Sequence, residues 1–347
     1  MSEPADDDTG RLADGPVLVE VTRGDAVESV HRGAFAVVDT EGRAVLAAGP
    51  IEADVFVRSA IKPLQALPLV ETGAAEAYGL DNAEMALACS SHNGESGHVD
   101  EVESWLARIG CGERDLVCRG HPPHGEAARR AFFAAGETPR RVHDNCSGKH
   151  TGFLTLARQL GAATGGYNEI THPVQQRVLG VLEAMTGLDD LTRRPHGRDG
   201  CGIPALALPL GNLALAMARL GDPADQPEHR QTACTRVRRA MAAHPWLVAG
   251  TDRFCTDGMM RLAPHVLLKN GAEGVQVASL PNLGLGIAIK IADGASRAAP
   301  VVMGALLEKL QCLDIETATA LAPHVRPAIA DRTGRTVGEI RPCRDVL

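Results

Sequence analysis

The sequence predicts an α+β fold in three layers, in which an antiparallel sheet built from both ends of the chain carries an inserted helical lobe. Two features of the pattern support this prediction. Runs typical of strands cluster near both ends of the chain, whereas helical periodicity dominates its middle. A length of 347 residues also fits one large domain or two lobes better than a string of modules.

The elements follow in order along the chain. Strands are expected first at 17–21, 34–39 and 43–48. Helices are expected next, most of them ended by Gly or Pro, at about 60–72, 82–89, 98–109, 126–135, 148–160, 172–186, 204–219 and 228–243. Strands return at 266–269, 274–280 and 284–291, before a last helix near 299–311.

These elements divide the chain into a tail and one catalytic domain. Residues 1–15 are acidic and polar and are interpreted as a disordered tail, and residues 16–347 as a single catalytic domain. The domain is expected to consist of a sheet lobe, 16–56 plus 264–347, and a helical lobe, 57–263. A cleft is expected where the two lobes meet.

Composition excludes several classes of function. A net charge of −8 without a basic run, and only 3% aromatic residues, argue against a nucleic-acid partner. No apolar stretch approaches the roughly twenty residues that cross a bilayer, and the acidic start is unlike a secretory signal. The odd number of nine cysteines suits reduced thiols. We therefore expect a soluble, cytoplasmic protein without a membrane partner.

Lysine is rare in this sequence, and its distribution is informative. Five lysines stand against thirty arginines, and three of the five lie in short motifs at Lys62, Lys149 and Lys269. Because a guanidinium group cannot lose its proton in a protein, each retained lysine is a candidate for work that needs a neutral amine. Proton abstraction and metal ligation are such work.

Ser59 and Lys62 form an S-x-x-K motif where the first strand region gives way to the first helix. Their spacing places both side chains on one face of the first turn, close enough to hydrogen-bond. The helix N-terminus favours the neutral form of Lys62, and so a base. The alternative is a capping serine followed by a solvated lysine.

Two further motifs complete a known pattern. Ser91, His92 and Asn93 read as S-x-N on a loop after an apolar helix, and Lys269 to Gly271 reads as K-x-G on a strand of the C-terminal hairpin. S-x-x-K, S-x-N and K-x-G, in that order, are the signature of serine β-lactamases and penicillin-binding proteins. The sequence therefore predicts a serine hydrolase.

Five longer segments carry a narrower resemblance: RSAIKPLQ at 58–65, CSSHNGE at 89–95, DNCSGKH at 144–150, GRDGCG at 197–202 and KNGAEG at 269–274. They resemble the bacterial type III L-asparaginases of the asparaginase II family, whose fold is similar to serine β-lactamases and glutaminases. The resemblance implies a homodimer that hydrolyses L-asparagine to L-aspartate and ammonia. It also implies serine–lysine pairs at Ser59 with Lys62 and at Ser91 with Lys269, and a zinc site at Cys146, Lys149 and Cys201.

The chemistry assigns a role to each member of the two pairs. Hydrolysis of a carboxamide needs an activated nucleophile, a proton for the departing ammonia and donors for the oxyanion. Ser59 is the expected nucleophile and Lys62 its base, while Ser91 bonded to Lys269 relays the proton. The backbone N–H groups of Ser59 and Ala272 are the expected oxyanion hole. The roles can also be reversed, with Ser91 as nucleophile and Lys269 as its base.

The substrate's own charges need partners as well. Arg58 suits the carboxylate of asparagine, and Asp199 or Glu273 its ammonium group. His92 and Asn93 are further candidate substrate contacts. For the zinc site, spacing alone is weak evidence, because buried free cysteine is common. The alternative functions are a glutaminase, a β-lactam-reactive serine hydrolase or a non-catalytic zinc-binding protein.

Overall fold

The two ends of the chain share one antiparallel sheet, as the sequence predicts. The computed structural model describes residues 11–347. The strand order is β10-β11-β1-β2-β9-β8-β7, and β3 pairs with β2 off this path. The strands are β1 (Val17–Arg23), β2 (Ala26–Asp39), β3 (Ala44–Ala48), β7 (Leu267–Gly271), β8 (Val275–Leu280), β9 (Leu285–Ile291), β10 (Ala328–Ala330) and β11 (Thr336–Pro342). The long strand β2 pairs with β1, β3 and β9 and so joins the two ends of the chain.

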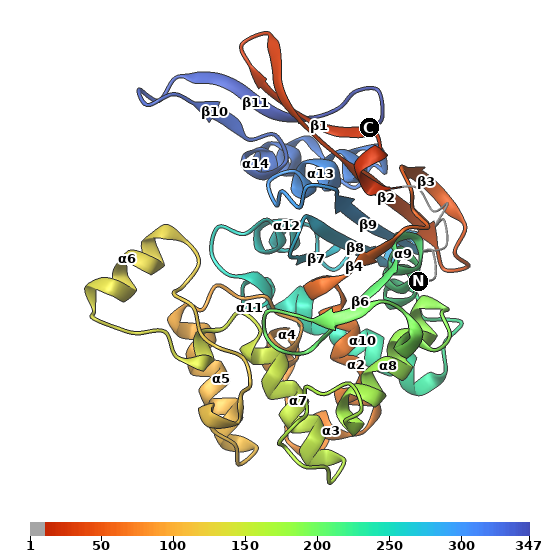
Figure 1. The fold of residues 1–347 in the computed structure, drawn as a ribbon, viewed down its shortest axis with the longest axis vertical. Helices are drawn as coiled ribbons and strands as arrows, with labels where there is room; N and C mark the ends of the chain where they lie inside the picture. The colour runs from red at the N-terminus through yellow and green to blue at the C-terminus, as the bar shows by residue number, and fades with distance from the viewer. Residues whose placement is uncertain (1–10) are drawn as a thin grey trace, which may run out of the picture.

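Helices cover both faces of this sheet (Figure 1). Helix α13 (Ala299–Lys309) packs on one face and is covered by α14 (Ile315–Val325), and α9 (Leu210–Gly221) packs on the other face against β2, β8 and β9. Gly286 on β9 allows α9 to approach, because a Cβ there would lie 2.0 Å from the Ala214 carbonyl oxygen. The fold is therefore α+β in three layers, as expected.

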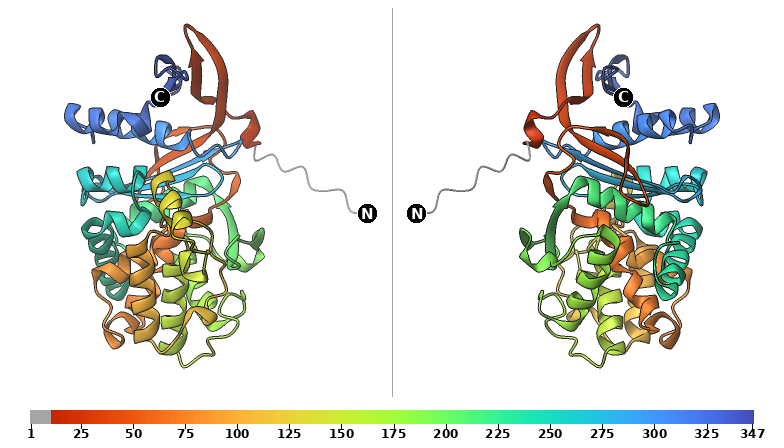
Figure 2. Two further views of the ribbon diagram at one scale, coloured as in Figure 1. Left: turned by 90° about the vertical axis from the view of Figure 1, so that its left-hand side faces the viewer. Right: turned by 90° about the vertical axis from the view of Figure 1, so that its right-hand side faces the viewer.

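Most of the remaining helices form a lobe beneath the sheet (Figure 2), whereas α12 (Phe254–Leu262) packs against β7 and α14. The helices of the lobe are α1 (Lys62–Gln65), α2 (Leu67–Glu71), α3 (Ala74–Ala77), α4 (Asn82–Ala88), α5 (Ser96–Arg108), α6 (Glu126–Ala134), α7 (Ser147–Gln159), α8 (Pro173–Thr186), α10 (Glu228–Ala243) and α11 (Pro245–Ala249). A small second sheet contains β4 (Asp54–Phe56), β6 (Pro204–Pro209) and β5 (His196–Arg198), in that order.

Three expectations about these elements need correction. Residues 204–209 form strand β6 rather than the start of a helix, and α9 then packs on the sheet although it lies inside 57–263. The expected helix at 60–72 is divided into the 3-10 turn η2 (Arg58–Ile61), α1 and α2, each α-helix with a proline in its first turn. Of the expected tail, residues 1–10 lie outside the described residues, whereas Leu12–Asp14 forms a 3-10 turn.

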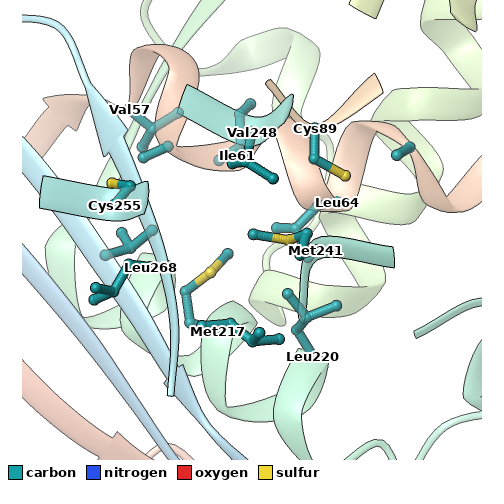
Figure 3. Close-up of a cluster of buried hydrophobic side chains, with 14 of the residues drawn as sticks. Val57, Ile61, Leu64, Cys89, Met217, Leu220, Met241, Val248, Cys255 and Leu268 are labelled. Carbon is teal, nitrogen blue, oxygen red and sulfur yellow. The ribbon is translucent and has the colours of Figure 1, made fainter. Parts of the chain in front are cut away.

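A buried apolar cluster joins the sheet to the helical lobe (Figure 3). Its members come from segments far apart in the sequence, and many adjoin the motifs singled out above. Val57 and Ile61 flank Ser59, and Leu268 precedes Lys269. Because interiors are closely packed, this cluster holds the polar side chains above it in fixed positions. In residues 11–347, no helix is both long and apolar enough to span a membrane.

Candidate active site

Ser91 lies at the centre of a buried polar cluster that includes two lysines. Its hydroxyl oxygen accepts a hydrogen bond from Lys62 Nζ at 3.1 Å and another from Lys269 Nζ at 2.9 Å. Lys62 comes from α1, Lys269 from β7, and Ser91 from the loop that follows α4. All three side chains are buried. The structure therefore brings together three of the four expected catalytic side chains through direct hydrogen bonds.

The loop that carries Ser91 is held by its own backbone. The N–H of Ser91 donates to the Val248 carbonyl at 2.9 Å, and the N–H of His92 donates to the Asn145 carbonyl at 3.2 Å. Helix α4, which precedes the loop, begins with a reciprocal capping pair of Asp81 and Glu84. The capped helix and the two backbone bonds fix the direction of Ser91.

Lys269 is placed where a positive charge is unfavourable. Burial lowers the pKa of Lys269 well below its ordinary value, and the nearby charge of Lys62 lowers it further. Its amine donates to the backbone oxygen of Asn270 at 2.7 Å. A lysine with a depressed pKa has a population of neutral amine near pH 7 that can accept a proton from a hydroxyl group.

Ser59 faces the same site from a strained turn. Arg58, the residue before it, has φ +48°, a left-handed conformation that is uncommon for a side chain larger than glycine. The turn η2 packs against β7, where a Cβ on Gly271 would lie 3.1 Å from the Val57 carbonyl oxygen. Within residues 11–347, Lys62 bonds to Ser91 and not to Ser59, which corrects the expected Ser59–Lys62 hydrogen bond.

A cavity of about 500 Å³ opens above these side chains. Both Ser59 and Ser91 line it, and Ser59 is the more exposed of the two. Ala272, the expected second oxyanion donor, lines it as well. Other lining residues come from several further segments and include Asn145, Arg253 and His124. The cavity is large enough for a small amide substrate.

Arg58 and Asp199 are paired with each other. Arg58 donates from Nε at 3.0 Å and from Nη2 at 2.7 Å to the same Asp199 oxygen. Burial alone raises the pKa of Asp199, but the charges of Lys149 and Arg58 outweigh it and hold that pKa below its ordinary value. The pair lines a separate cavity of only about 10 Å³, which Ser59 and Lys149 also line. The structure therefore does not place Arg58 or Asp199 on the wall of the large cavity.

His92 has a structural position. Its side chain is completely buried, its Nδ1 accepts the N–H of Gly94 at 3.0 Å, and its Nε2 lies 2.9 Å from Ser147 Oγ. Because Nδ1 is an acceptor, the proton is on Nε2 and is donated to Ser147. Burial lowers the pKa of His92 well below its ordinary value. The expectation that His92 contacts substrate is corrected, because it does not line the large cavity.

Asn93 and Glu273 also lie off the cavity wall. Asn93 is buried, and its side chain bonds to the backbone oxygen of Thr251 and to Arg253. Glu273 is exposed, with φ +60°, and its carboxylate lies close to Gly294. Both expected substrate contacts are therefore corrected, since each side chain is engaged elsewhere.

Cys146, Lys149 and Cys201 form a second buried cluster. Lys149 Nζ donates to Cys201 Sγ at 3.0 Å, and a hydrogen bond from Cys201 lowers the pKa of Cys146. Burial opposes the charge on Lys149, but the sulfurs of Cys146 and Cys201 outweigh it and raise the pKa of Lys149. The expected zinc ligands therefore meet at one place. No group of three His, Cys, Asp or Glu side chains suited to a metal occurs among residues 11–347.

Sequence reasoning missed two residues at this site. Arg253 lines the large cavity, and Lys290 donates to the backbone oxygen of Glu273 at 2.8 Å and so supports the hairpin turn that carries Ala272. Arg253 is one of thirty arginines and lies in no recognisable motif. Lys290 is one of only five lysines, and that rarity was a signal that could have identified it.

Several solved structures resemble this one at low similarity. Mglu in its native form in 4.3 M NaCl shares 14% sequence identity with a TM-score of 0.44, covering 81% of this chain, and this chain spans 62% of that one. A putative β-lactamase from Bacteroides dorei shares 13% sequence identity with a TM-score of 0.44, and the match covers 80% of this chain and 93% of that one. Simvastatin synthase (LovD) from Aspergillus terreus shares 13% sequence identity with a TM-score of 0.39, and the match covers 83% of this chain and 93% of that one. These values are too low to support a statement about function.

The family comparison is more specific. No significant sequence match was found among curated proteins. A family model described as L-asparaginase II, in contrast, matches residues 19–342, which is nearly all of the described chain. This range contains every motif that forms the two buried clusters. The chain belongs to the L-asparaginase II family.

Proposed function

We propose that this protein hydrolyses L-asparagine to L-aspartate and ammonia through an acyl-enzyme on a serine. The observation that carries the proposal is the hydrogen-bonded chain of Lys62, Ser91 and Lys269 beneath a cavity that Ser59 also lines. Amide hydrolysis needs a nucleophile that substrate can reach and a path for one proton from that nucleophile to the leaving ammonia. The site offers both.

Ser59 is the nucleophile in this proposal. Its hydroxyl is more exposed in the cavity than that of Ser91, which is buried and accepts hydrogen bonds from two amines. Lys62 turns from Ser91 to Ser59 when substrate binds and removes the serine proton. Hydrogen bonds of this kind often tighten only in the substrate complex.

Ser91 and Lys269 then return the proton. The Ser59 oxygen attacks the side-chain carbonyl carbon, and backbone N–H groups of Ser59 and Ala272 stabilise the oxyanion. The C–N bond breaks as Ser91 passes a proton to the leaving nitrogen, and water hydrolyses the resulting ester by the same route in reverse. In the same step Lys62 passes the Ser59 proton on to Ser91, so Ser91 ends protonated, while the neutral amine of Lys269 holds Ser91 in register.

The reverse assignment has one specific observation in its favour. Ser91, not Ser59, is the hydroxyl that lies within hydrogen-bonding distance of Lys269, the lysine with the lowered pKa. In this alternative Ser91 attacks the substrate and Lys269 is its base. The two assignments share the reaction and the substrate and differ in the residue that is acylated.

Acid quench followed by intact and peptide mass spectrometry decides between them. With L-asparagine, or with a slowly hydrolysed ester analogue, we expect an aspartyl adduct on the peptide that contains Ser59. An adduct on Ser91 reverses the roles, and the absence of any adduct on either serine contradicts the acyl-enzyme. Ammonia release should be much faster with L-asparagine than with L-glutamine, and ammonia release from neither amide contradicts the proposed function itself.

We further propose that Cys146, Lys149 and Cys201 hold a zinc ion. The donor set fits, since zinc accepts thiolate and nitrogen ligands and these three side chains already converge. A zinc ion there would supply positive charge beside the small cavity that Ser59 lines. Cys146 is already prone to ionise, and Lys149 must release a proton to become a ligand.

Chelation tests the zinc proposal separately from the reaction. We expect about one zinc per chain in elemental analysis, and a rise in KM with a measurable kcat once the metal is removed. Near-zero zinc content together with unchanged kinetics in Cys146→Ser and Cys201→Ser would show that both cysteines are ordinary buried thiols and not zinc ligands.

A homodimer and a cytoplasmic location are also proposed, on the resemblance and the composition described above. Sedimentation at several protein concentrations tests the dimer. A single species of monomer mass at micromolar concentration contradicts it.

A further inference from the structure

The carboxylate of the proposed substrate needs a positively charged partner in the large cavity, and Arg58, the first candidate, does not supply one. An amino-acid amide carries a free carboxylate group, and the expected partner, Arg58, is already bound to Asp199. Lys62 and Lys269 are buried and donate to Ser91 and to backbone oxygens. A carboxylate placed in this cavity therefore needs another positively charged side chain.

Arg253 meets that need. It lines the large cavity together with Ser59 and Ser91, at the residue before α12. Its guanidinium makes one side-chain hydrogen bond, from Nη1 to Asn93 Oδ1 at 2.9 Å. An arginine has five N–H donors, so most of them remain for a ligand. Among residues 11–347, no carboxylate lies within 4.0 Å of this guanidinium.

The loop that carries Arg253 is a built structure. Asn93 Nδ2 donates to the Thr251 carbonyl at 2.9 Å, and Glu95 accepts from the Thr251 N–H at 2.9 Å and from its hydroxyl at 2.8 Å. Gly250 has φ +110°, and a Cβ there would lie 2.6 Å from the Asn93 side chain. The S-x-N motif therefore serves two purposes, since Ser91 faces the lysines and Asn93 positions Arg253.

The charge of Arg253 acts inside the cavity. His124 also lines the cavity, and its pKa is lowered to about 4 by burial first, then by His121 and by Arg253. Arg253 also contributes to the lowered pKa of Lys269, after burial and Lys62. The same positive charge of Arg253 that lowers the pKa of His124 and of Lys269 would attract a bound carboxylate.

We infer that Arg253 binds the α-carboxylate of the substrate and so makes this site selective for small amides that carry a free carboxylate. The inference rests on the proposed function, because it names the part of the substrate that the cavity recognises. The planar guanidinium can offer two parallel N–H groups to a carboxylate while Asn93 holds a third. Asp252, the preceding residue, also lines the cavity and supplies an acceptor for the ammonium group.

The test compares two substrates with the same scissile amide, L-asparagine and its α-methyl ester, by ammonia release. We expect the protein to prefer the free acid in kcat/KM, and Arg253→Gln to reduce that preference by about ten- to a hundredfold, mainly through KM for L-asparagine. Arg253→Lys should retain part of it, because the charge remains but the planar fork is lost. The control is Arg261→Gln, which removes an exposed arginine on α12 and should change nothing.

Two outcomes overturn the inference. The first is an Arg253→Gln variant that keeps the full preference for the free acid. The second is an equal fall in kcat/KM for L-asparagine and for its α-methyl ester, as a purely structural role would require. Calorimetric titration with L-aspartate gives a second measurement that needs no turnover. Weaker L-aspartate binding by Arg253→Gln than by the parent protein supports the inference even if neither amide is hydrolysed, whereas equal or undetectable binding by both overturns it.

Discussion

Two buried lysines in this molecule respond in opposite directions to their surroundings. Lys269 lies among neutral oxygens and near the amine of Lys62, and its pKa is lowered. Lys149 lies against the sulfurs of Cys146 and Cys201, and its pKa is raised. Both side chains are almost completely buried. Burial alone therefore does not decide the charge of a lysine.

The neighbours decide it. Burial disfavours the charged form at both positions, but at Lys149 the two sulfurs of Cys146 and Cys201 outweigh that cost. At Lys269 burial and the like charge of Lys62 outweigh the opposing influence of Cys255. The environment of Lys269 suits a proton acceptor. The environment of Lys149 suits a positively charged counter-ion that loses its proton only when a metal ion takes the proton's place.

Replacing Lys269 with arginine tests whether the first cluster needs a neutral amine, and we expect the largest effect here. Lys269→Arg puts a permanent positive charge in place of a neutral amine, so kcat/KM for L-asparagine should fall by about two to four orders of magnitude. Lys309→Arg, on the exposed end of α13, is the control and should be silent. A Lys269→Arg variant with most of its activity would show that the neutral form is not used.

The same change in the second cluster should act through the metal. Lys149→Arg retains a counter-ion for Cys146 but cannot ligate zinc, so we expect zinc affinity to fall by at least about tenfold. Competition with a chromophoric chelator measures it. Cys201→Ser, in which a hydroxyl replaces a better ligand, should behave in the same way. Undiminished zinc affinity in both variants would remove Lys149 and Cys201 from the ligand set.

The lowered pKa of Lys269 also predicts how stability depends on pH. Between the folded pKa and the unfolded pKa of about 10.4, the unfolded state binds more protons, so the free energy of unfolding rises with pH. The slope for this residue is at most about 1.4 kcal/mol per pH unit. Relative to Lys269→Met, the parent protein should therefore gain stability as pH increases from 7 to 10 in denaturant titrations. A constant difference would mean that Lys269 is charged in the folded protein.

The smallest expected effect concerns the hairpin that carries Ala272. Lys290 donates to the backbone oxygens of Glu273 and Ile291. Lys290→Met removes both bonds and should lower the free energy of unfolding by about 1–2 kcal/mol, measured from the urea midpoint. Lys309→Met is the matched control. A Lys290 variant as stable as the control would mean that the two carbonyl groups find water instead.

Much of the fold could be predicted from local patterns. Helices such as α7 and α10 follow from periodicity, and β7, β8 and β9 lie within a few residues of their expected bounds, whereas α14, β10 and β11 were not expected. Residues 204–219 were predicted wrongly because β6 runs directly into α9, and Pro209, the N-cap residue of α9, was not recognised as the boundary between them. Such a boundary is decided by pairing with β4 and β5, which lie far away in the sequence.

The site was predicted in its parts but not in all of its contacts. Ser59, Ser91 and Lys269 line or adjoin the large cavity as expected. The Ser59–Lys62 bond failed because the turn begins with a left-handed Arg58 and is a 3-10 turn, which directs Lys62 toward Ser91. The pairing of Arg58 with Asp199 depends on residues 141 positions apart, which local sequence cannot show.

The central strand β2 has a consequence for synthesis of the chain. Its partner β9 begins roughly 250 residues later, so the ribosome needs about 12–50 s to supply it at ordinary elongation rates. During that time the buried half of β2, from Ala34 to Val38, has a free edge toward the missing strand. Such an edge can pair with another chain. We therefore expect this edge to need cover, from a chaperone or from the protein's own helical lobe, until the last fifth of the chain emerges.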